Sequence, residues 1–272
     1  MTPGHPERLY CGVDVGAAAT KVVLLDGSGD VRGRAVRPSG VDYDATARAV
    51  LADALAAATL PGTGSPSIAR TLATGYGREN VSFADRTLTE IYCHSAGCYH
   101  HYRRAITIVD IGGQDNKVIH LDAEGRRNDF RMNRKCAAGT GSFIEEIALR
   151  LALPVEAIER LAASTDQAVR LSSFCTVFAK TEILSHLRAG VPVEQVARGA
   201  LLSVVQRILE MDPLGGEVVA TGGVVAHNPT VARLLAEKLG REVQVAPHAQ
   251  FSGAEGAALL ARDEPAKGDR GP

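Results

Sequence analysis

The sequence has almost no net charge, no tryptophan and no long uninterrupted apolar run. Its 272 residues include 30 lysines and arginines against 31 aspartates and glutamates, which gives a formal net charge of −1. Because long-range attraction to nucleic acid or to an anionic membrane needs an excess of positive charge, we expect neither as a partner. No segment approaches the roughly 18 consecutive apolar residues of a membrane-spanning helix. The absence of tryptophan excludes no class of function.

Cysteines are few and unevenly spaced, and their number, five, is odd. This usage argues against a secreted disulfide framework and for a reducing, cytoplasmic setting. Residues 1–7 are polar and contain proline and glycine, so we expect no signal peptide. Cys93 and Cys98 stand near three histidines, but their spacing matches no standard zinc motif. We expect a structural or surface role for this pair.

Hydrophobic residues make up 45% of the chain, which is enough for one large domain or two medium ones. Their spacing predicts an alternation of strands and helices. Strands are predicted over 10–16, 22–25, 31–36, 68–74, 106–113, 117–121, 217–223 and 243–246. Helices are predicted over 44–58, 90–99, 192–211, 228–239 and 253–261, with two more after the cysteine motifs described below.

The first predicted strand ends in Asp14-x-Gly16, and a tight turn leads into the second strand. The turn consists of Ala17, Ala18, Ala19, Thr20 and Lys21. Small residues leave backbone N–H groups open to a phosphate, to which Thr20 could add a hydroxyl and Lys21 a charge. Asp14 stands where a hydrated Mg²⁺ would sit. An ordinary hairpin remains the alternative interpretation of this segment alone.

The same pattern recurs later in the chain, where a strand ends in Asp110-x-Gly112-Gly113. Gln114 and Asp115 follow directly. Two related halves that face one nucleotide would place both Asp-x-Gly loops on its phosphates. A third strand ends in Gly222-Gly223, and a pair of glycines lets a flat base or ribose approach the backbone.

Two cysteines each stand just before a predicted helix. Cys136 opens the run Cys-Ala-Ala-Gly-Thr-Gly-Ser, in which Ser142 and Glu145 have capping-box spacing. Cys175 follows a polar turn. A helix N-terminus favours a thiolate or an anionic cluster, although a buried structural cysteine is the alternative for either residue alone. Two ligands do not complete a tetrathiolate site, but a symmetric dimer would supply the four that a [4Fe–4S] cluster needs.

Taken together, these motifs resemble the activator ATPases of 2-hydroxyacyl-CoA dehydratases and the related ATPase subunits of benzoyl-CoA reductase, within the sugar kinase, hsp70 and actin superfamily. The resemblance extends over about residues 9–261. It implies an α/β fold of two RNase H-like (actin/hsp70-type ATPase) domains with a nucleotide cleft between them. The first domain would comprise residues 1–104 plus 251–272, and the second, residues 105–250, would carry the cluster cysteines.

The resemblance also implies an activity and a set of site residues. The expected protein is an ATP-dependent reductase component that takes an electron from ferredoxin or flavodoxin and passes it to a dehydratase or reductase component. It would act as a homodimer, or as a pair with a related subunit, holding one oxygen-sensitive [4Fe–4S] cluster together with ATP and Mg²⁺. The implied catalytic residues are Asp14, Asp110, Gln114 and Asp115; the nucleotide-binding residues are Gly16, Ala17, Ala18, Ala19, Thr20, Lys21, Gly112, Gly113, Gly222, Gly223 and Gln250; and the cluster ligands are Cys136 and Cys175.

Two departures from the family pattern concern details of the site. The first phosphate turn is usually rich in serine and threonine but has alanines here, and Lys180 stands where an acidic residue is expected. Other functions on this fold also remain open. A small-molecule kinase would use Asp115 as a base but would leave Cys136 and Cys175 without a role. A non-catalytic ATP-binding regulator or chaperone is the third alternative.

Overall fold

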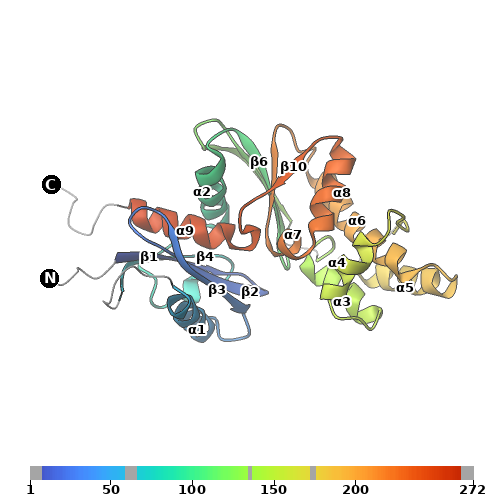
Figure 1. The fold of residues 1–272 in the computed structure, drawn as a ribbon, viewed down its shortest axis with the longest axis horizontal. Coiled ribbons are helices and arrows are strands. Elements are labelled where there is room, and N and C mark those ends of the chain that lie inside the picture. Colours follow the sequence, from blue (N-terminus) through green and yellow to red (C-terminus); the bar gives the residue numbers. More distant parts are fainter. Residues whose placement is uncertain (1–7, 59–65, 134–136, 172–175, 265–272) are drawn as a thin grey trace. The chain divides into compact units, whose positions relative to one another are not determined.

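The chain divides into two compact units, each built on one five-stranded sheet (Figure 1). The structure is a computed structural model that describes residues 8–58, 66–133, 137–171 and 176–264. Met1–Tyr102 and Phe251–Pro272 belong to the first unit, and Arg103–Gln250 to the second. The chain therefore enters the second unit after α2 and returns to the first unit before α9.

The sheet of the first unit is mixed, with the strand order β3-β2-β1-β4-β5. β1, β2 and β3 form an antiparallel meander, while β4 pairs parallel with β1 and β5 pairs parallel with β4. The strands are β1 (Arg8–Val15), β2 (Ala19–Leu25), β3 (Val31–Pro38), β4 (Ser67–Thr74) and β5 (Arg86–Thr87). The helices are α1 (Tyr43–Ala56), α2 (Glu90–Tyr102) and α9 (Ser252–Asp263), with a short 3-10 turn at η1 (Arg78–Asn80).

Alternate side chains of this sheet point to opposite faces, and a helix covers each face. Val22 packs in one core cluster with residues of α1, whereas Val23 packs in another with residues of α9. Gly12 lies on the α9 face, where a Cβ would come within 1.9 Å of the Ala254 carbonyl oxygen. The glycine therefore lets α9 lie directly on β1. Asp14, two positions further along the strand, shares this face.

α2 and α9 cross closely because each carries a glycine at the contact. A Cβ at Gly256 would lie 1.8 Å from the Cys93 carbonyl oxygen, and one at Gly97 would lie 2.2 Å from a carbonyl oxygen of α9. Near the end of α2, His101 Nε2 hydrogen-bonds Glu255 Oε1 at 2.8 Å, and this bond raises the pKa of His101. α2, which precedes the second unit in the chain, and α9, which follows it, are thus joined by close packing and by a hydrogen bond.

Cys93 and Cys98 are buried residues of α2 and are not disulfide-bonded. Cys93 packs among Leu72, Ala257 and Ala261, and burial raises the pKa of its thiol to about 12. Burial among apolar side chains gives Cys93 a packing role.

The second unit repeats the mixed sheet, with the strand order β10-β9-β6-β7-β8. Its strands are β6 (Ile106–Ile111), β7 (Asn116–Leu121), β8 (Arg127–Asn133), β9 (Val218–Thr221) and β10 (Val243–Val245). Its helices are α3 (Gly141–Arg150), α4 (Glu156–Ala163), α5 (Thr176–Arg188), α6 (Val193–Met211), α7 (Gly223–His227) and α8 (Pro229–Leu239), and η2 (Ala249–Phe251) leads back towards α9. Among the helices that the structure describes, none is both long and apolar enough to cross a membrane.

One large core cluster fills the second unit. β6 and β7 contribute Val109 and Val118, and α3 contributes Phe143, which is fully buried. α6 runs through this cluster with Val204 and other apolar residues. The apolar periodicity that predicted these strands and helices therefore corresponds to their buried faces.

Several elements differ from the prediction. β8 was not predicted because its first five residues are exposed at the sheet edge and show no apolar alternation. The strand that was predicted to end in the Gly222-Gly223 pair stops at Thr221, and α7 begins at Gly223. The predicted capping box is wrong: α3 begins at Gly141, so Ser142 lies inside its first turn. The Ser142 hydroxyl instead donates to the Gly113 carbonyl at 2.8 Å.

Candidate functional site

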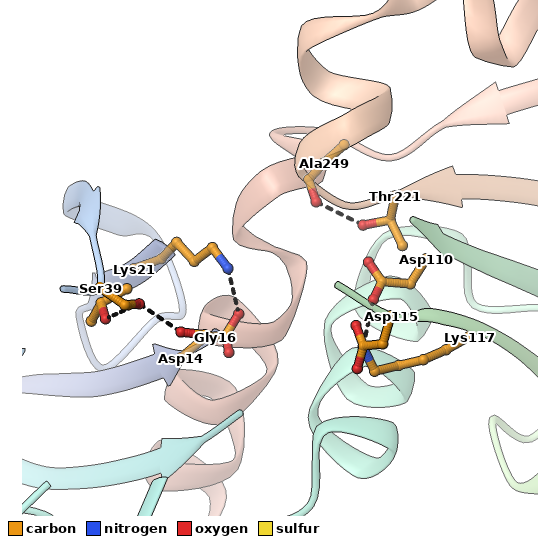
Figure 2. A network of polar contacts seen from close by, with 10 residues as sticks. Asp14, Gly16, Lys21, Ser39, Asp110, Asp115, Lys117, Thr221 and Ala249 are labelled. Carbon is orange, nitrogen blue, oxygen red and sulfur yellow. Dashed lines mark hydrogen bonds and ion pairs between the residues drawn. The ribbon is translucent and has the colours of Figure 1, made fainter. Parts of the chain in front are cut away.

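The first Asp-x-Gly loop joins β1 to β2, and its aspartate faces a lysine across the hairpin. Asp14 and Lys21 are register partners, and Lys21 Nζ donates to Asp14 Oδ2 at 3.3 Å (Figure 2). The turn is closed by a bond from Gly16 N to the Ala19 carbonyl at 3.0 Å. Asp14 is 7% exposed, so its carboxylate is largely enclosed at the end of the strand. The predicted residues Ala17 and Ala18 complete this turn.

Thr20, which was predicted as part of this turn, lies in β2 and points away from the carboxylate. Its side chain is fully buried, on the face of β2 that packs with α1. Thr20 Oγ1 is 2.9 Å from Ser39 Oγ, and the Ser39 hydroxyl donates to the Gly16 carbonyl at 2.6 Å. These hydrogen bonds stabilise the turn on the side away from the Asp14 carboxylate.

The second Asp-x-Gly loop joins β6 to β7 and has the same construction. Asp110 and Lys117 are register partners, and a bond from Gly112 N to the Asp115 carbonyl closes the turn at 2.9 Å. Lys117 Nζ donates to Asp110 Oδ2 at 3.1 Å and to Asp115 Oδ1 at 2.8 Å (Figure 2). Gln114 is exposed in this turn. The structure therefore brings Asp110 and Asp115 together around a lysine that the sequence analysis did not identify.

A glycine at the end of the neighbouring parallel strand makes room for each carboxylate. Thr74 pairs with Asp14, and Gly75 follows with φ +91°; a Cβ on Gly75 would lie 2.5 Å from Asp14 Oδ1. Correspondingly, Gly222 has φ +97°, and its Cβ would lie 2.6 Å from Asp110 Oδ1. Gly222 was predicted to lie against a base or ribose, and Gly75 was not predicted as a site residue. The repeated Thr-Gly after a buried strand, at residues 74–75 and 221–222, was the available signal.

Replacing Gly75 with alanine is expected to displace Asp14 in the first Asp-x-Gly loop and so to slow Mg-ATP hydrolysis. A left-handed φ at a non-glycine residue costs about 1–3 kcal/mol, and the new methyl group would also collide with Asp14 Oδ1 and the Val15 carbonyl. The measurement is Mg-ATP hydrolysis, with the melting temperature of each variant recorded. Gly240→Ala is the matched control because Gly240 also has a positive φ, +63°, and nothing within 4 Å of its Cβ position. Equal rates of hydrolysis by the Gly75→Ala and Gly240→Ala variants would contradict the expectation that Gly75 is needed to position Asp14.

The end of β9 is tied to the segment that returns to the first unit. The Thr221 hydroxyl donates to the Ala249 carbonyl at 2.7 Å (Figure 2), and Gly222 N donates to the same carbonyl at 2.9 Å. Gln250 Nε2 lies 3.7 Å from the Cβ position of Gly223. The predicted nucleotide-binding residues Gly222, Gly223 and Gln250 are therefore neighbours in the structure.

The start of α3 is bonded directly to the second Asp-x-Gly loop. Gly141 N donates to the Gly112 carbonyl at 2.9 Å, and Ser142 N donates to the Gly113 carbonyl at 2.8 Å. Asn116, which is buried at the start of β7, donates through Nδ2 to the Gly139 carbonyl at 2.8 Å. A shift of residues 112–116 would thus be transmitted to residues 139–142 through hydrogen bonds within one unit.

Some predicted site features cannot be placed. Cys136 and Cys175 lie outside the described residues, as does the side chain of Lys180. The described chain resumes after Cys136 at residue 137 and after Cys175 at residue 176, where α5 begins. The cluster ligands therefore stay a prediction from the sequence.

Comparison with known proteins identifies close relatives over nearly the whole chain. Residues 11–261 match the BadF/BadG/BcrA/BcrD ATPase family. The activator of lactoyl-CoA dehydratase from Anaerotignum propionicum is 42% identical over 253 residues, which cover 92% of this chain and 96% of that protein. One of the subunits of benzoyl-CoA reductase from Thauera aromatica is a weaker relative, 26% identical over 264 residues, covering 92% of each chain.

Two solved structures have the same fold. Component A of (R)-2-hydroxyglutaryl-CoA dehydratase from Acidaminococcus fermentans has a TM-score of 0.86 at 36% identity, over 93% of this chain and 97% of that chain. The activator of 2-hydroxyisocaproyl-CoA dehydratase from Clostridium difficile, with bound ADPNP, has a TM-score of 0.85 at 35% identity, over 94% of each chain. These likenesses confirm the predicted actin/hsp70-type ATPase fold.

Proposed function

The chain belongs to the BadF/BadG/BcrA/BcrD ATPase family, and from this we propose that it is the ATP-hydrolysing activator of a 2-hydroxyacyl-CoA dehydratase. In this role it transfers single low-potential electrons from a ferredoxin or flavodoxin to the dehydratase component. Relatives that are named activators of such dehydratases match more than nine-tenths of the chain, which favours this partner over a benzoyl-CoA reductase. The weaker match to the benzoyl-CoA reductase chain keeps that reductase as the second candidate.

Asp14 and Asp110 serve the nucleotide in this proposal. Mg²⁺ is usually held by one or two carboxylates together with substrate phosphates rather than by a complete protein cage. The described residues fit that requirement: the two aspartates end buried strands, and no group of three or more histidine, cysteine, aspartate or glutamate side chains forms a cage there. Asp14 and Asp110 would hold the ion, which would supply positive charge to offset that of the phosphates. The exposed Gln114 is suited to orient the attacking water.

Cys136 and Cys175 hold a [4Fe–4S] cluster shared by two subunits in this proposal. Four cysteine thiolates are the usual ligands of such a cluster, and each subunit supplies two. The described residues next to these cysteines are compatible with a subunit interface. On α5, Phe178 is 67% exposed and Leu184 is 40% exposed, and both are large apolar side chains. A partner subunit over α5 would remove them from water.

One observation supports a coupling between ATP hydrolysis and electron transfer: residues 112–113 are hydrogen-bonded to the first turn of α3. Gly112 and Gly113 belong to the loop predicted to contact phosphate, and α3 begins five residues after Cys136. Movement of the loop around the phosphates would pull on the backbone that follows this cysteine. Changed hydrogen bonding and solvent exposure at a cluster alter its potential.

Anaerobic purification tests the proposal against the kinase and the regulator. We expect a brown dimer with about four irons, as one [4Fe–4S] cluster requires, and an ATPase activity without a phosphorylated product. A colourless protein that phosphorylates a small molecule would favour the kinase. ATP binding without electron transfer to any dehydratase component would favour the regulator.

A further inference from the structure

Each Asp-x-Gly loop carries a lysine seven residues after its aspartate, directly across the hairpin. Asp14 pairs with Lys21 and Asp110 pairs with Lys117, in the same antiparallel register. In both hairpins the lysine ammonium contacts the aspartate Oδ2, at 3.3 and 3.1 Å (Figure 2). The two lysines therefore occupy equivalent positions in a repeated structure.

The repeat differs at the position that closes each turn. Ala19 accepts the closing backbone bond in the first loop, and Asp115 accepts it in the second. Only the second of these positions carries a carboxylate, and Lys117 Nζ contacts it at 2.8 Å. Lys21 thus contacts one carboxylate, whereas Lys117 contacts two.

The two lysines also differ in exposure. The Lys21 side chain is 15% exposed, while that of Lys117 is 3% exposed and that of Asp110 is 4% exposed. Lys117 lies against Asp110 and Asp115, with two of its three N–H donors directed to their oxygens. Without its charge, two neighbouring carboxylates would repel each other in a largely buried place. Its position is suited to fixing the carboxylates and poorly suited to contacting a phosphate.

We propose that Lys117 is a positioning residue for ATP hydrolysis, acting through Asp110 and Asp115, and that Lys21 is the lysine that contacts the nucleotide. This inference rests on the proposed nucleotide site. Lys21 and Lys117 occupy equivalent positions in the two hairpins, but the proposal gives them different functions. Lys117 holds the spacing of the two carboxylates, and Lys21 adds positive charge at the more open loop.

The test separates nucleotide affinity from the rate of hydrolysis in Lys117→Arg and Lys21→Met. Arginine keeps the buried charge, but its longer side chain and planar guanidinium place the N–H donors differently from the lysine ammonium. Because misplacing catalytic groups by about 1 Å can cost about 100-fold in rate, we expect kcat of Lys117→Arg to fall by that order. Its affinity for Mg-ADPNP should stay within about three-fold, a change of less than 1 kcal/mol. Lys21→Met should instead weaken Mg-ADPNP binding about ten-fold or more, as expected for the loss of one charge-assisted bond.

Melting temperature and iron content are measured on the same samples, so that a folding defect is recognised. Lys117→Met is the second variant; it removes the charge and should lower kcat at least as far as arginine does. A Lys117→Arg protein with unchanged kcat, or with Mg-ADPNP binding weakened as much as in Lys21→Met, would overturn the inference while wild-type hydrolysis still supports the proposed function. A wild-type protein that hydrolyses no ATP would overturn both.

Discussion

Replacing Cys136 or Cys175 with serine is expected to abolish the iron–sulfur cluster and, with it, all electron transfer. In a symmetric dimer each single substitution removes two of the four thiolates, and serine is a poor ligand for iron in such a cluster. Nucleotide binding should largely survive, because the two Asp-x-Gly loops contain neither cysteine. Iron, visible absorbance and Mg-ADPNP affinity are measured on protein that is kept anaerobic throughout.

Cys98→Ser is the control for this substitution. Cys98 is a buried thiol of α2 in the first unit, so the same chemical change there should leave the iron content at the wild-type level. Retention of about four irons per dimer in either the Cys136 or the Cys175 variant would show that the ligands are assigned wrongly.

Replacing Asp110 with asparagine is expected to stop Mg-ATP hydrolysis while the cluster remains. The substitution keeps the shape that fills the space beside Gly222 but removes the charge that contacts Lys117 and that, in the proposed site, would face the metal. Loss of one preorganised electrostatic contact of this kind typically costs about 100- to 1,000-fold in kcat. Asp14→Asn in the first loop should have a similar effect. The rate of phosphate release and the anaerobic absorbance spectrum are compared for each variant.

Asp212→Asn provides the matched control in the second unit. Asp212 is also a buried carboxylate, and it contacts His120 and Arg131 rather than the loop residues. His120 lies near the far end of β7 from Asn116, so a change at Asp212 should affect stability more than hydrolysis. Hydrolysis by Asp110→Asn at the rate of Asp212→Asn would contradict the proposed metal-facing role of Asp110.

The Asp-x-Gly loops could be found in the sequence because a buried apolar strand that ends in an acidic residue and a glycine is a strong local pattern. The orientation of their neighbours was harder to predict. Alternation along β2 places Thr20 on the face of Val22, which packs with α1, and places Lys21 on the face of Asp14. The prediction that the Thr20 hydroxyl is available to phosphate did not take this period of two into account.

Lys117 and Gly75 were missed for a different reason. Lys117 contacts Asp110 only because a turn closed between Gly112 and Asp115 sets the register of the hairpin. Gly75 approaches Asp14 only because β4 pairs parallel with β1. Local periodicity gives neither the register of the β6–β7 hairpin, which depends on how its turn closes, nor the pairing of β1 with β4, which are distant in the sequence. The edge strand β8 was missed because exposure on both faces removes the periodic signal altogether.

We propose that ATP hydrolysis drives an electron out of the cluster, and the most direct measurement follows the oxidation of the reduced protein by its dehydratase partner. The reduced dimer is mixed anaerobically with that component, and the spectrum of the cluster is recorded with Mg-ATP, with Mg-ADPNP and without nucleotide. Oxidation of the cluster to completion with Mg-ATP, and little or none with ADPNP or without nucleotide, is the predicted result. Oxidation at the same rate in all three mixtures would contradict the account, because the electron would then move without hydrolysis.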